Sequence, residues 1–297
     1  MPVALLGGLT AAVAWGIMDV AAAIAGRRLG SLRTVVIEQF GSLAGLGLFV
    51  LIIPSALGPQ AAAGVLAAIP LGVISSVAFV TQFAALRAGP VAVVSPLVAA
   101  YGGFTVLFAV VLRGEVLHPM QALGAVMATA GIILTGIIFH SRSLRTARFV
   151  GPGVLLAVIS AVAFGLASTL IAGPVREYGT TAAIAGSRIG NTVCSLALFI
   201  FATTSGTSAF RPLLSSAPLA WRMVVLILIV GVGDIAGFLA FGAGLDVGPV
   251  WLVGLVSSFG PVLGVLYGVI WLKERLRPTQ WLGMLLIAVA LVILSVT

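Results

Sequence analysis

The sequence predicts an all-α polytopic membrane protein of ten transmembrane helices, arranged as two inverted five-helix repeats. Three observations predict this fold class: the composition, the length of the apolar runs and a long internal repeat. Of 297 residues, 61% are hydrophobic and 7% are charged, whereas a soluble domain carries about 25% charged residues. Because the mean hydropathy is +1.27, the chain cannot cover itself with polar groups, and we expect lipid as its solvent.

The apolar runs have about the 20-residue length of a helix that crosses the hydrocarbon core. Strands of a membrane barrel would instead alternate polar and apolar residues. Only helices and closed barrels satisfy their backbone groups in lipid, so we expect helices. Turn signals rich in Gly, Pro and Arg separate ten predicted spans, at residues 3–25, 34–53, 64–86, 89–112, 119–140, 152–172, 180–203, 221–245, 248–272 and 279–296.

An internal repeat organises the whole chain. Residues 89–124 align with residues 248–283 at an offset of 159 without a gap, and 13 of 36 positions are identical. The motif AVAWG in the first span likewise matches AVAFG in the sixth span, at an offset of 149. Each half holds five spans, an odd number, so the halves enter the membrane from opposite sides, as in many secondary transporters. We therefore expect a first repeat at 1–140, a basic connecting loop at 141–151 and a second repeat at 152–297.

The charges predict an orientation rather than a nucleic-acid partner. The net charge of +8 lies almost wholly in the turns between spans, where membrane proteins carry the charges that orient them. Twelve Lys and Arg residues follow odd-numbered spans, and only Arg113 and Arg176 follow even-numbered ones. The positive-inside rule then places both termini outside the cytoplasm. Since no Lys or Arg precedes the first apolar run, we expect that run to be a retained span rather than a signal peptide.

A turn with the pattern Glu-x-Leu-x-Pro-x-Gln-x-x-Gly occurs twice, at 115–124 and at 274–283, and each copy follows a helix that begins GPV. With the pair Trp15-Gly16 in the first span, these residues resemble the drug/metabolite transporter superfamily, in its ten-span EamA-type branch. The resemblance implies a carrier in the cell (inner or plasma) membrane for small organic metabolites, often an exporter of amino acids or related compounds. It also implies a central cavity lined mainly by spans 1, 3, 4, 6, 8 and 9, and often cytoplasmic termini, opposite to the charge pattern.

Two carboxylates within spans are the first candidates for function, because an ionisable side chain there costs roughly 2.5–3.5 kcal/mol on insertion scales. Asp234 lies near the middle of the eighth span among glycines. It is either a contact for a substrate amine, a proton-coupling group, or a buried Asp that bonds to a neighbouring span. Asp19 follows Trp15 by four residues, so both project from one helix face. Asp19 is the second binding and proton-coupling candidate, or it reaches the arginines at 27–28.

A polar stripe on the seventh span includes Arg188 and Asn191, three residues apart. It either lines an aqueous cavity, where Arg188 would bind a substrate carboxylate, or it packs against another span and pairs Arg188 with Asp19 or Asp234. For Glu38 we expect an interfacial ion pair with Arg33.

The remaining candidates lie on spans 3, 4, 8 and 9, because equivalent faces of an inverted repeat converge on a midplane site. Corresponding Gly/Pro interruptions in the two halves indicate a binding site, and the segments 96–103 and 257–261 form such a pair. Aromatic residues there either stack on a substrate or simply pack. The binding candidates on these spans, beyond Asp234, are Ser75, Phe79, Gln82, Ser95, Tyr101, Phe238, Trp251, Ser257 and Ser258.

The sequence favours a carrier over an enzyme, since it lacks HExxH, GxSxG and nucleotide-binding motifs. We expect no catalytic residue, no metal and no cofactor. His118 and His140 stand alone, and Glu115 and Glu274 lie in turns, where we expect an ion pair or a helix N-cap. The predicted partners are a small-molecule substrate and the lipid bilayer, with a monomer or homodimer as the assembly. An uncoupled facilitator or channel and a flippase for lipid-linked sugars are the alternatives.

Overall fold

The computed structural model describes residues 2–88, 94, 97–136, 152–205, 213–214, 221–260 and 278–296. Within these ranges it does not describe the side chains at 18–24, 27, 135–136, 152, 280 and 295. Several predictions therefore lie outside the described residues, namely those for the Asp19 side chain, Ser95, Pro96, Pro261, Glu274, His140 and the loop at 141–151.

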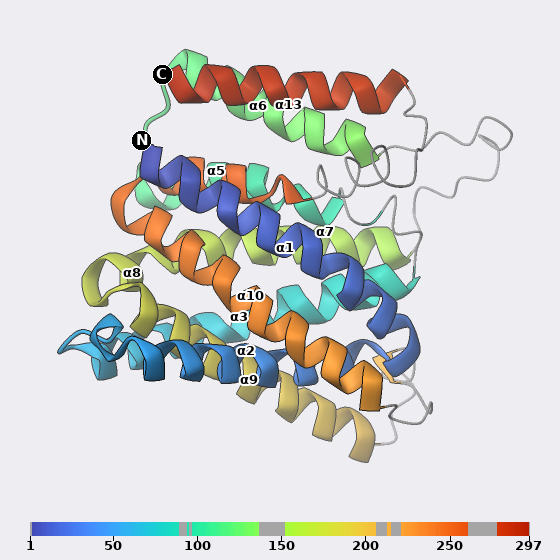
Figure 1. The fold of residues 1–297 in the computed structure, drawn as a ribbon. Coiled ribbons are helices and arrows are strands. Elements are labelled where there is room, and N and C mark those ends of the chain that lie inside the picture. Colours follow the sequence, from blue (N-terminus) through green and yellow to red (C-terminus); the bar gives the residue numbers. More distant parts are fainter. Residues whose placement is uncertain are drawn as a thin grey trace, which may run out of the picture.

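The described residues form helices and no strand (Figure 1). Helical residues occur in all ten predicted spans, which confirms the prediction of a helical polytopic membrane protein. Five helical stretches are long and apolar enough to cross a membrane, and four shorter apolar helices accompany them. The helices are α1 (Pro2–Leu29), α2 (Ser31–Ile52), η1 (Pro54–Ala56), α3 (Ala61–Ala88), α5 (Tyr101–Arg113), α6 (Pro119–Gly136), α7 (Pro152–Leu170), α8 (Ala172–Tyr178), α9 (Thr180–Thr204), α10 (Trp221–Val247), α11 (Val250–Ser257) and α13 (Pro278–Val296).

Helix packing follows the two-fold relation between the repeats. Helix α3 packs against α7 and α9, and its repeat partner α10 packs against α1 and α2. On α3, Gly72 lies against the carbonyl oxygen of Ser187, and on α10, Gly231 lies against that of Glu38. These two contacts join equivalent positions, since Gly231 is offset from Gly72 by 159 and Ser187 from Glu38 by 149. Such close approach of backbones depends on small residues.

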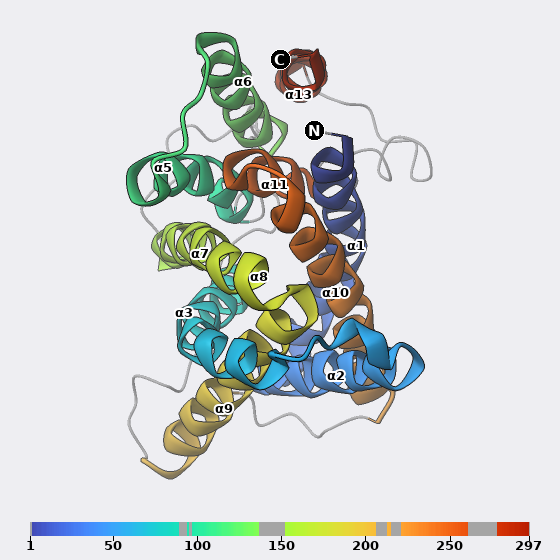
Figure 2. The same cartoon turned by 90° about the vertical axis from the view of Figure 1, so that its left-hand side faces the viewer.

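The last helices of the two halves, α6 and α13, pack against each other. Figures 1 and 2 show this pair at the periphery, beside the other helices. Gly131 of α6 permits close contact with the carbonyl oxygen of Gly283 on α13, because a Cβ at Gly131 would lie 2.7 Å from that oxygen. The pair leaves the remaining eight predicted spans to surround the centre of the protein.

Two glycines with equivalent positions make the tightest connections between helices. Gly30 separates α1 from α2 with φ 84° and ψ 151°, and Gly179 separates α8 from α9 with φ 90° and ψ 152°. A residue with a Cβ is strained at these φ values. The sequence offset between the two glycines is 149, so the repeat extends to backbone conformation.

The predicted sixth span ends later than expected. A Gly-Pro pair at 173–174 predicted its end near residue 172, but α8 carries the chain on to Tyr178. Pro174 lies in the first turn of α8, where the backbone N–H groups have no partner within the helix. The missing N–H of proline therefore costs nothing there, and the pair marks a helix start rather than a helix end.

Both interrupted spans break at equivalent positions. The helix of the fourth span has a turn at Ala100 before α5 begins, and α11 of the ninth span ends at Ser257, followed by turn residues at 258–259. Ala100 and Phe259 are offset by 159. The sequence predicted the two interruptions at positions offset by a few residues, and the backbone places them in register.

Candidate functional site

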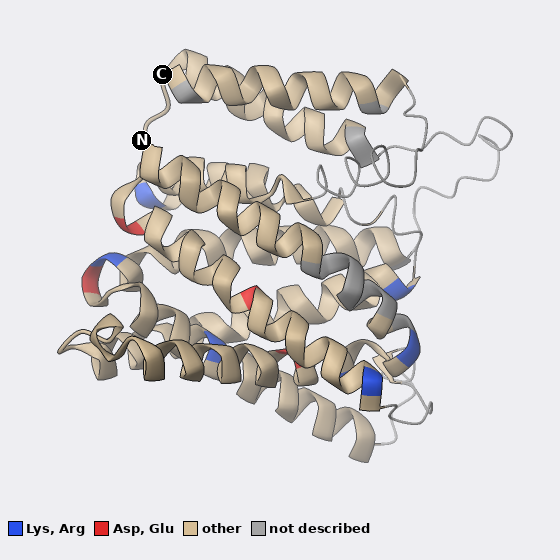
Figure 3. Ribbon diagram, in the orientation of Figure 1, with Lys and Arg blue, Asp and Glu red and all other residues tan. Residues whose placement is uncertain are grey.

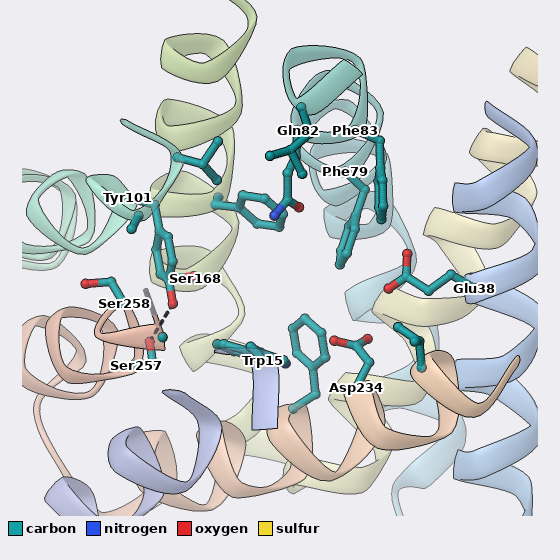
Figure 4. A pocket seen from close by; sticks show the side chains of 17 residues that line it. Trp15, Glu38, Phe79, Gln82, Phe83, Tyr101, Ser168, Asp234, Ser257 and Ser258 are labelled. Atoms are coloured by element: carbon teal, nitrogen blue, oxygen red, sulfur yellow. Dashed lines mark hydrogen bonds between the residues drawn. The ribbon is translucent and has the colours of Figure 1, made fainter. Parts of the chain in front are cut away.

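A cavity of about 90 Å³ lies at the centre of the bundle, between the two halves (Figure 4). All of the spans 1, 3, 4, 6, 8 and 9 that the resemblance implied contribute to it, and span 2 adds one residue. The lining residues are Trp15, Glu38, Phe79, Gln82, Phe83, Leu86, Val98, Ala99, Tyr101, Phe164, Ser168, Val230, Asp234, Phe238, Ser257, Ser258 and Gly260.

Eight of the fourteen predicted binding residues line this cavity: Trp15, Phe79, Gln82, Tyr101, Asp234, Phe238, Ser257 and Ser258. Four others are buried in the bundle outside the lining, namely Ser75, Arg188, Asn191 and Trp251. The Asp19 side chain and Ser95 belong to the part of the chain that is not described. The sequence pattern thus located the region, whereas it did not separate lining residues from their supports.

Aromatic rings from both halves form the walls. The ring of Trp15 on α1 lies 4.7 Å from that of Phe238 on α10. Phe164 on α7 contacts Phe79 edge to face at 5.1 Å and lies 5.9 Å from the ring of Tyr101. Tilted and edge-to-face arrangements at these distances are the favoured ones for aromatic pairs. The remaining surface of these rings is available to a molecule that fills the cavity.

Hydroxyl groups gather at one end of the cavity, where the interrupted helices meet. The hydroxyl of Tyr101 lies 3.0 Å from that of Ser257, which links the fourth span to the ninth (Figure 4). Ser257 and Ser258 also donate to backbone carbonyl oxygens one turn back, at 2.9 and 2.7 Å. Gly102 allows this crossing, because a Cβ there would overlap the hydroxyl of Ser258.

Two carboxylates, Glu38 and Asp234, lie at the other end (Figure 4). Asp234 is 5% exposed, and its Oδ2 lies 3.6 Å from a guanidinium nitrogen of Arg188. That separation is an ion pair without a hydrogen bond, and Oδ2 has no hydrogen-bond partner among the described residues. Glu38 is 3% exposed and interacts electrostatically with the same Arg188.

Arg188 is 1% exposed and lies behind the cavity wall. Its guanidinium carbon is 3.9 Å from the ring centre of Phe238 and 5.2 Å from that of Phe79. A single long hydrogen bond of 3.3 Å joins it to Gln39, and its Nε has no hydrogen-bond partner in the described part of the chain. Of the two predicted partners, Asp234 forms an ion pair with Arg188, and the side chain of Asp19 lies outside the described residues.

The indole of Trp15 lies beside these charges. Its Nε1 lies near the carboxylate of Asp234 but does not meet the geometry of a hydrogen bond to it. Gly237 makes room for the ring, since a Cβ at that position would lie 2.5 Å from Nε1. The buried N–H of Trp15 is therefore a hydrogen-bond donor without a partner among the described residues.

Asn191 has a packing role in this structure. Its Oδ1 accepts a hydrogen bond from Ser195 at 3.0 Å, and Ser195 in turn lies 2.8 Å from the hydroxyl of Ser76 on α3. This chain of polar side chains joins α9 to α3. The contacts between helices account for the Oδ1 of Asn191, whereas its Nδ2 has no hydrogen-bond partner among the described residues.

Glu115 caps a helix of the opposite half. Its two carboxylate oxygens accept hydrogen bonds from the backbone N–H groups of Val250 and Trp251, each at 3.0 Å. Arg176 lies 3.9 Å from Glu115 and donates to the carbonyl oxygens of Leu245 and Gly248, at 3.0 and 2.7 Å. The sequence predicted a structural role for Glu115, and the helix that it caps is α11.

Nine of the lining residues were not among the candidates, and Glu38, Phe164 and Ser168 are three of these nine. The offset of 149 carries the signal for two of them, because it relates Phe164 to Trp15 and Ser168 to Asp19. For Glu38 no such signal exists, since its equivalent is Ser187. Among the described residues, no group of three or more His, Cys, Asp and Glu comes together that would hold a metal ion.

Comparison with known proteins gives a family. The model of the EamA-like transporter family matches the chain twice, over residues 2–137 and 151–296. One similar solved structure, a crystal structure, covers 99% of this chain and 96% of its own with a TM-score of 0.74, at 22% identity, and so supports the fold alone. No curated protein sequence matches. Nearly the whole chain is thus accounted for by two copies of one family unit, and the protein belongs to the EamA-like transporter family.

Proposed function

We propose that this protein is a secondary transporter that exports small organic metabolites, such as amino acids or related compounds. The observation that carries the proposal is the central cavity, which is lined by charged, hydroxyl and aromatic side chains from both repeats. Such groups are costly inside a membrane protein unless they serve a partner or a pathway. A site at the interface between two inverted repeats is the usual site of a carrier.

A break in the two-fold relation supports alternating access. Gly16 on α1 lies against Gly260, so perfect symmetry would place the equivalent Gly165 against Tyr101. Gly165 instead lies against Phe104, three residues further along α5, which is nearly one helical turn. A carrier whose halves exchange conformations would be asymmetric in each state. The displacement of the contact by three residues is an asymmetry of that kind.

The closed side of the proposed cycle is the one that carries Glu115. The cap that Glu115 makes on α11 ties the two halves together there, and the hydrogen bond of Arg176 to Leu245 joins α8 to α10 within the second half. The cavity lies towards the opposite side, since its lining residue Leu86 is two residues from the end of α3 at Ala88. Together with the charge pattern of the loops, this supports a cavity nearer the cytoplasm and both termini outside. A C-terminal reporter fusion that is active only in the cytoplasm would contradict this orientation.

Proton coupling belongs to the proposal, with Asp234 as the coupling group and Asp19 as the second candidate. Asp234 faces the cavity and its Oδ2 accepts no hydrogen bond from the described residues. A carboxylate whose hydrogen bonds are incomplete exchanges a proton with less loss of structure than a fully bonded one. The proposed location is the cell membrane, as a monomer or homodimer.

Transport by the purified protein in liposomes tests the proposal. We expect saturable uptake that a pH gradient accelerates, and we expect Asp234→Asn to remove the acceleration. Glu177→Gln is a matched control, because Glu177 is exposed on α8 away from the cavity. Uptake that does not saturate would indicate a channel, and uptake that the pH gradient does not change would indicate an uncoupled facilitator. Movement of lipid-linked sugars would indicate a flippase.

A further inference from the structure

We propose that the cargo is a small organic monocation, with an ammonium group on an apolar or aromatic body. The inference rests on the carrier function proposed above and narrows its substrate class from amino acids and related compounds to amines without a carboxylate. In the bound state the ammonium group lies between Asp234 and Glu38, and the body of the cargo lies against the aromatic walls.

The charge balance of the site favours a cation. Glu38 and Asp234 are the only charged side chains among the described residues that line the cavity. The guanidinium of Arg188 lies behind the cavity wall, and no Lys or Arg of the described ranges lines the cavity. An ammonium group would therefore meet acidic side chains and no cation of the lining. A substrate carboxylate would add a third negative charge in a site of low dielectric, where like charges repel strongly.

Arg188 is covered on the cavity side by aromatic rings. Phe238 and Phe79 both line the cavity, and both rings lie against the guanidinium, at 3.9 and 5.2 Å. A substrate carboxylate would have to displace these rings before it reached Arg188. The structure therefore disfavours the hypothesis that Arg188 binds a substrate carboxylate.

The carboxylate of Asp234 is suited to a second cation. Asp234 is 5% exposed, and its Oδ2 has no hydrogen-bond partner in the described ranges. Its ion pair with Arg188, at 3.6 Å, is longer than a charge-assisted hydrogen bond. An ammonium group has three donors and would supply the missing hydrogen bond.

The ring walls suit the same cargo. Aromatic faces attract ammonium groups and guanidinium groups electrostatically, and Phe238 already holds the guanidinium of Arg188 in this way. Arg188 thus occupies one side of Asp234 as an internal cation. It lowers the net negative charge that a substrate cation meets, so it competes electrostatically with the substrate for Asp234.

A matched ligand series tests the charge of the cargo. Titration calorimetry on the purified full-length protein in nanodiscs would compare phenethylamine, phenylalanine and 3-phenylpropionate, which share a ring and differ in charge. We expect phenethylamine to bind at least about tenfold more tightly than the other two. A preference for the zwitterion or the carboxylate would overturn the cationic cargo but leave the carrier function intact. Failure of all three to bind would also overturn the inference, whereas the absence of any gradient-driven solute uptake would overturn the carrier itself.

The sign of one substitution separates competition from direct binding. If Arg188 competes with the cargo, Arg188→Gln raises the affinity for phenethylamine by about tenfold, since it removes a positive charge beside Asp234. If Arg188 binds the cargo, the same change lowers affinity, and the inference is wrong. Glu38→Gln gives a second test in case Arg188→Gln does not fold. It lowers phenethylamine affinity by about tenfold, whereas the exposed control Glu177→Gln leaves it unchanged, and equal affinity in both variants contradicts the inference.

Discussion

The protein has two acid–arginine pairs, Glu115 with Arg176 and Asp234 with Arg188. They lie in different regions of the protein and differ in their hydrogen bonds. At the end of the bundle, Glu115 accepts two backbone hydrogen bonds of 3.0 Å, and Arg176 makes two more, of 3.0 and 2.7 Å. At the centre, Asp234 and Arg188 are 3.6 Å apart, and the one side-chain hydrogen bond of Arg188 among the described residues is 3.3 Å long. The members of the first pair are 3.9 Å apart, but each makes two hydrogen bonds to the backbone, whereas the Oδ2 of Asp234 and the Nε of Arg188 have no hydrogen-bond partner in the described ranges.

The difference teaches how to separate structural from functional charges in this fold. A charge with its full set of short hydrogen bonds stabilises one conformation and leaves nothing for a ligand. A buried charge with an incomplete set costs stability, so its presence calls for another purpose. Glu115 recurs in the sequence as Glu274 and looks the more conspicuous acid, yet the geometry makes Asp234 the binding candidate.

The largest expected effect on stability belongs to Glu115→Ala. The change removes two charge-assisted hydrogen bonds and leaves the N–H groups of Val250 and Trp251 without their acceptor, so we expect a loss of about 3 kcal/mol in the free energy of unfolding. Thermal unfolding in detergent measures it, with the exposed Glu177→Ala as the control. Equal midpoints for the two variants would show that the cap is not a structural contact.

The next effect concerns binding rather than stability. Asp234→Asn should weaken phenethylamine binding by at least about tenfold, or 1.4 kcal/mol. The free energy of unfolding should fall by less than in Glu115→Ala, because Glu38 stays near the guanidinium of Arg188. Calorimetry and thermal unfolding on the same samples check both expectations. A strong loss of stability with unchanged affinity would reverse the comparison.

A smaller effect is expected where the two interrupted helices meet. Tyr101→Phe removes the hydrogen bond to Ser257 and keeps the ring against Phe164. We expect about 1 kcal/mol or less in the free energy of unfolding, the usual contribution of one neutral hydrogen bond. Chemical or thermal unfolding of the variant measures it. Tyr101→Ala serves as comparison, since it also removes the ring and should cost more.

Much of the fold could be predicted from the sequence, because in lipid the hydrophobic pattern determines the spans and the repeat determines their pairing. The two offsets of 149 and 159 also make Gly30 equivalent to Gly179 and Ala100 equivalent to Phe259 in the repeat. The continuation of the sixth span through Pro174 could not be foreseen. A proline can stand in the first turn of a helix or just after the end of one, so its presence does not tell which of the two applies.

The candidate site was predicted in part. Helix spacing and the repeat predict lining residues such as Phe79, Gln82 and Phe238. They do not predict how deep in the bundle a side chain lies. Spacing cannot tell that rings cover Arg188, or that Glu38 lies in the cavity lining rather than only at the membrane interface beside Arg33. Those positions depend on the packing of α9 against α3 and of α2 against α10, which are tertiary contacts.

The most direct measurement of the central claim is the affinity for phenethylamine of two variants, Asp234→Asn and Glu115→Gln, titrated in nanodiscs beside the unaltered protein. The contrast between incomplete and complete hydrogen bonds predicts that Asp234→Asn loses at least about tenfold in affinity. It predicts that Glu115→Gln binds like the unaltered protein. Loss of affinity in Glu115→Gln with full affinity in Asp234→Asn would contradict the assignment of the two acids.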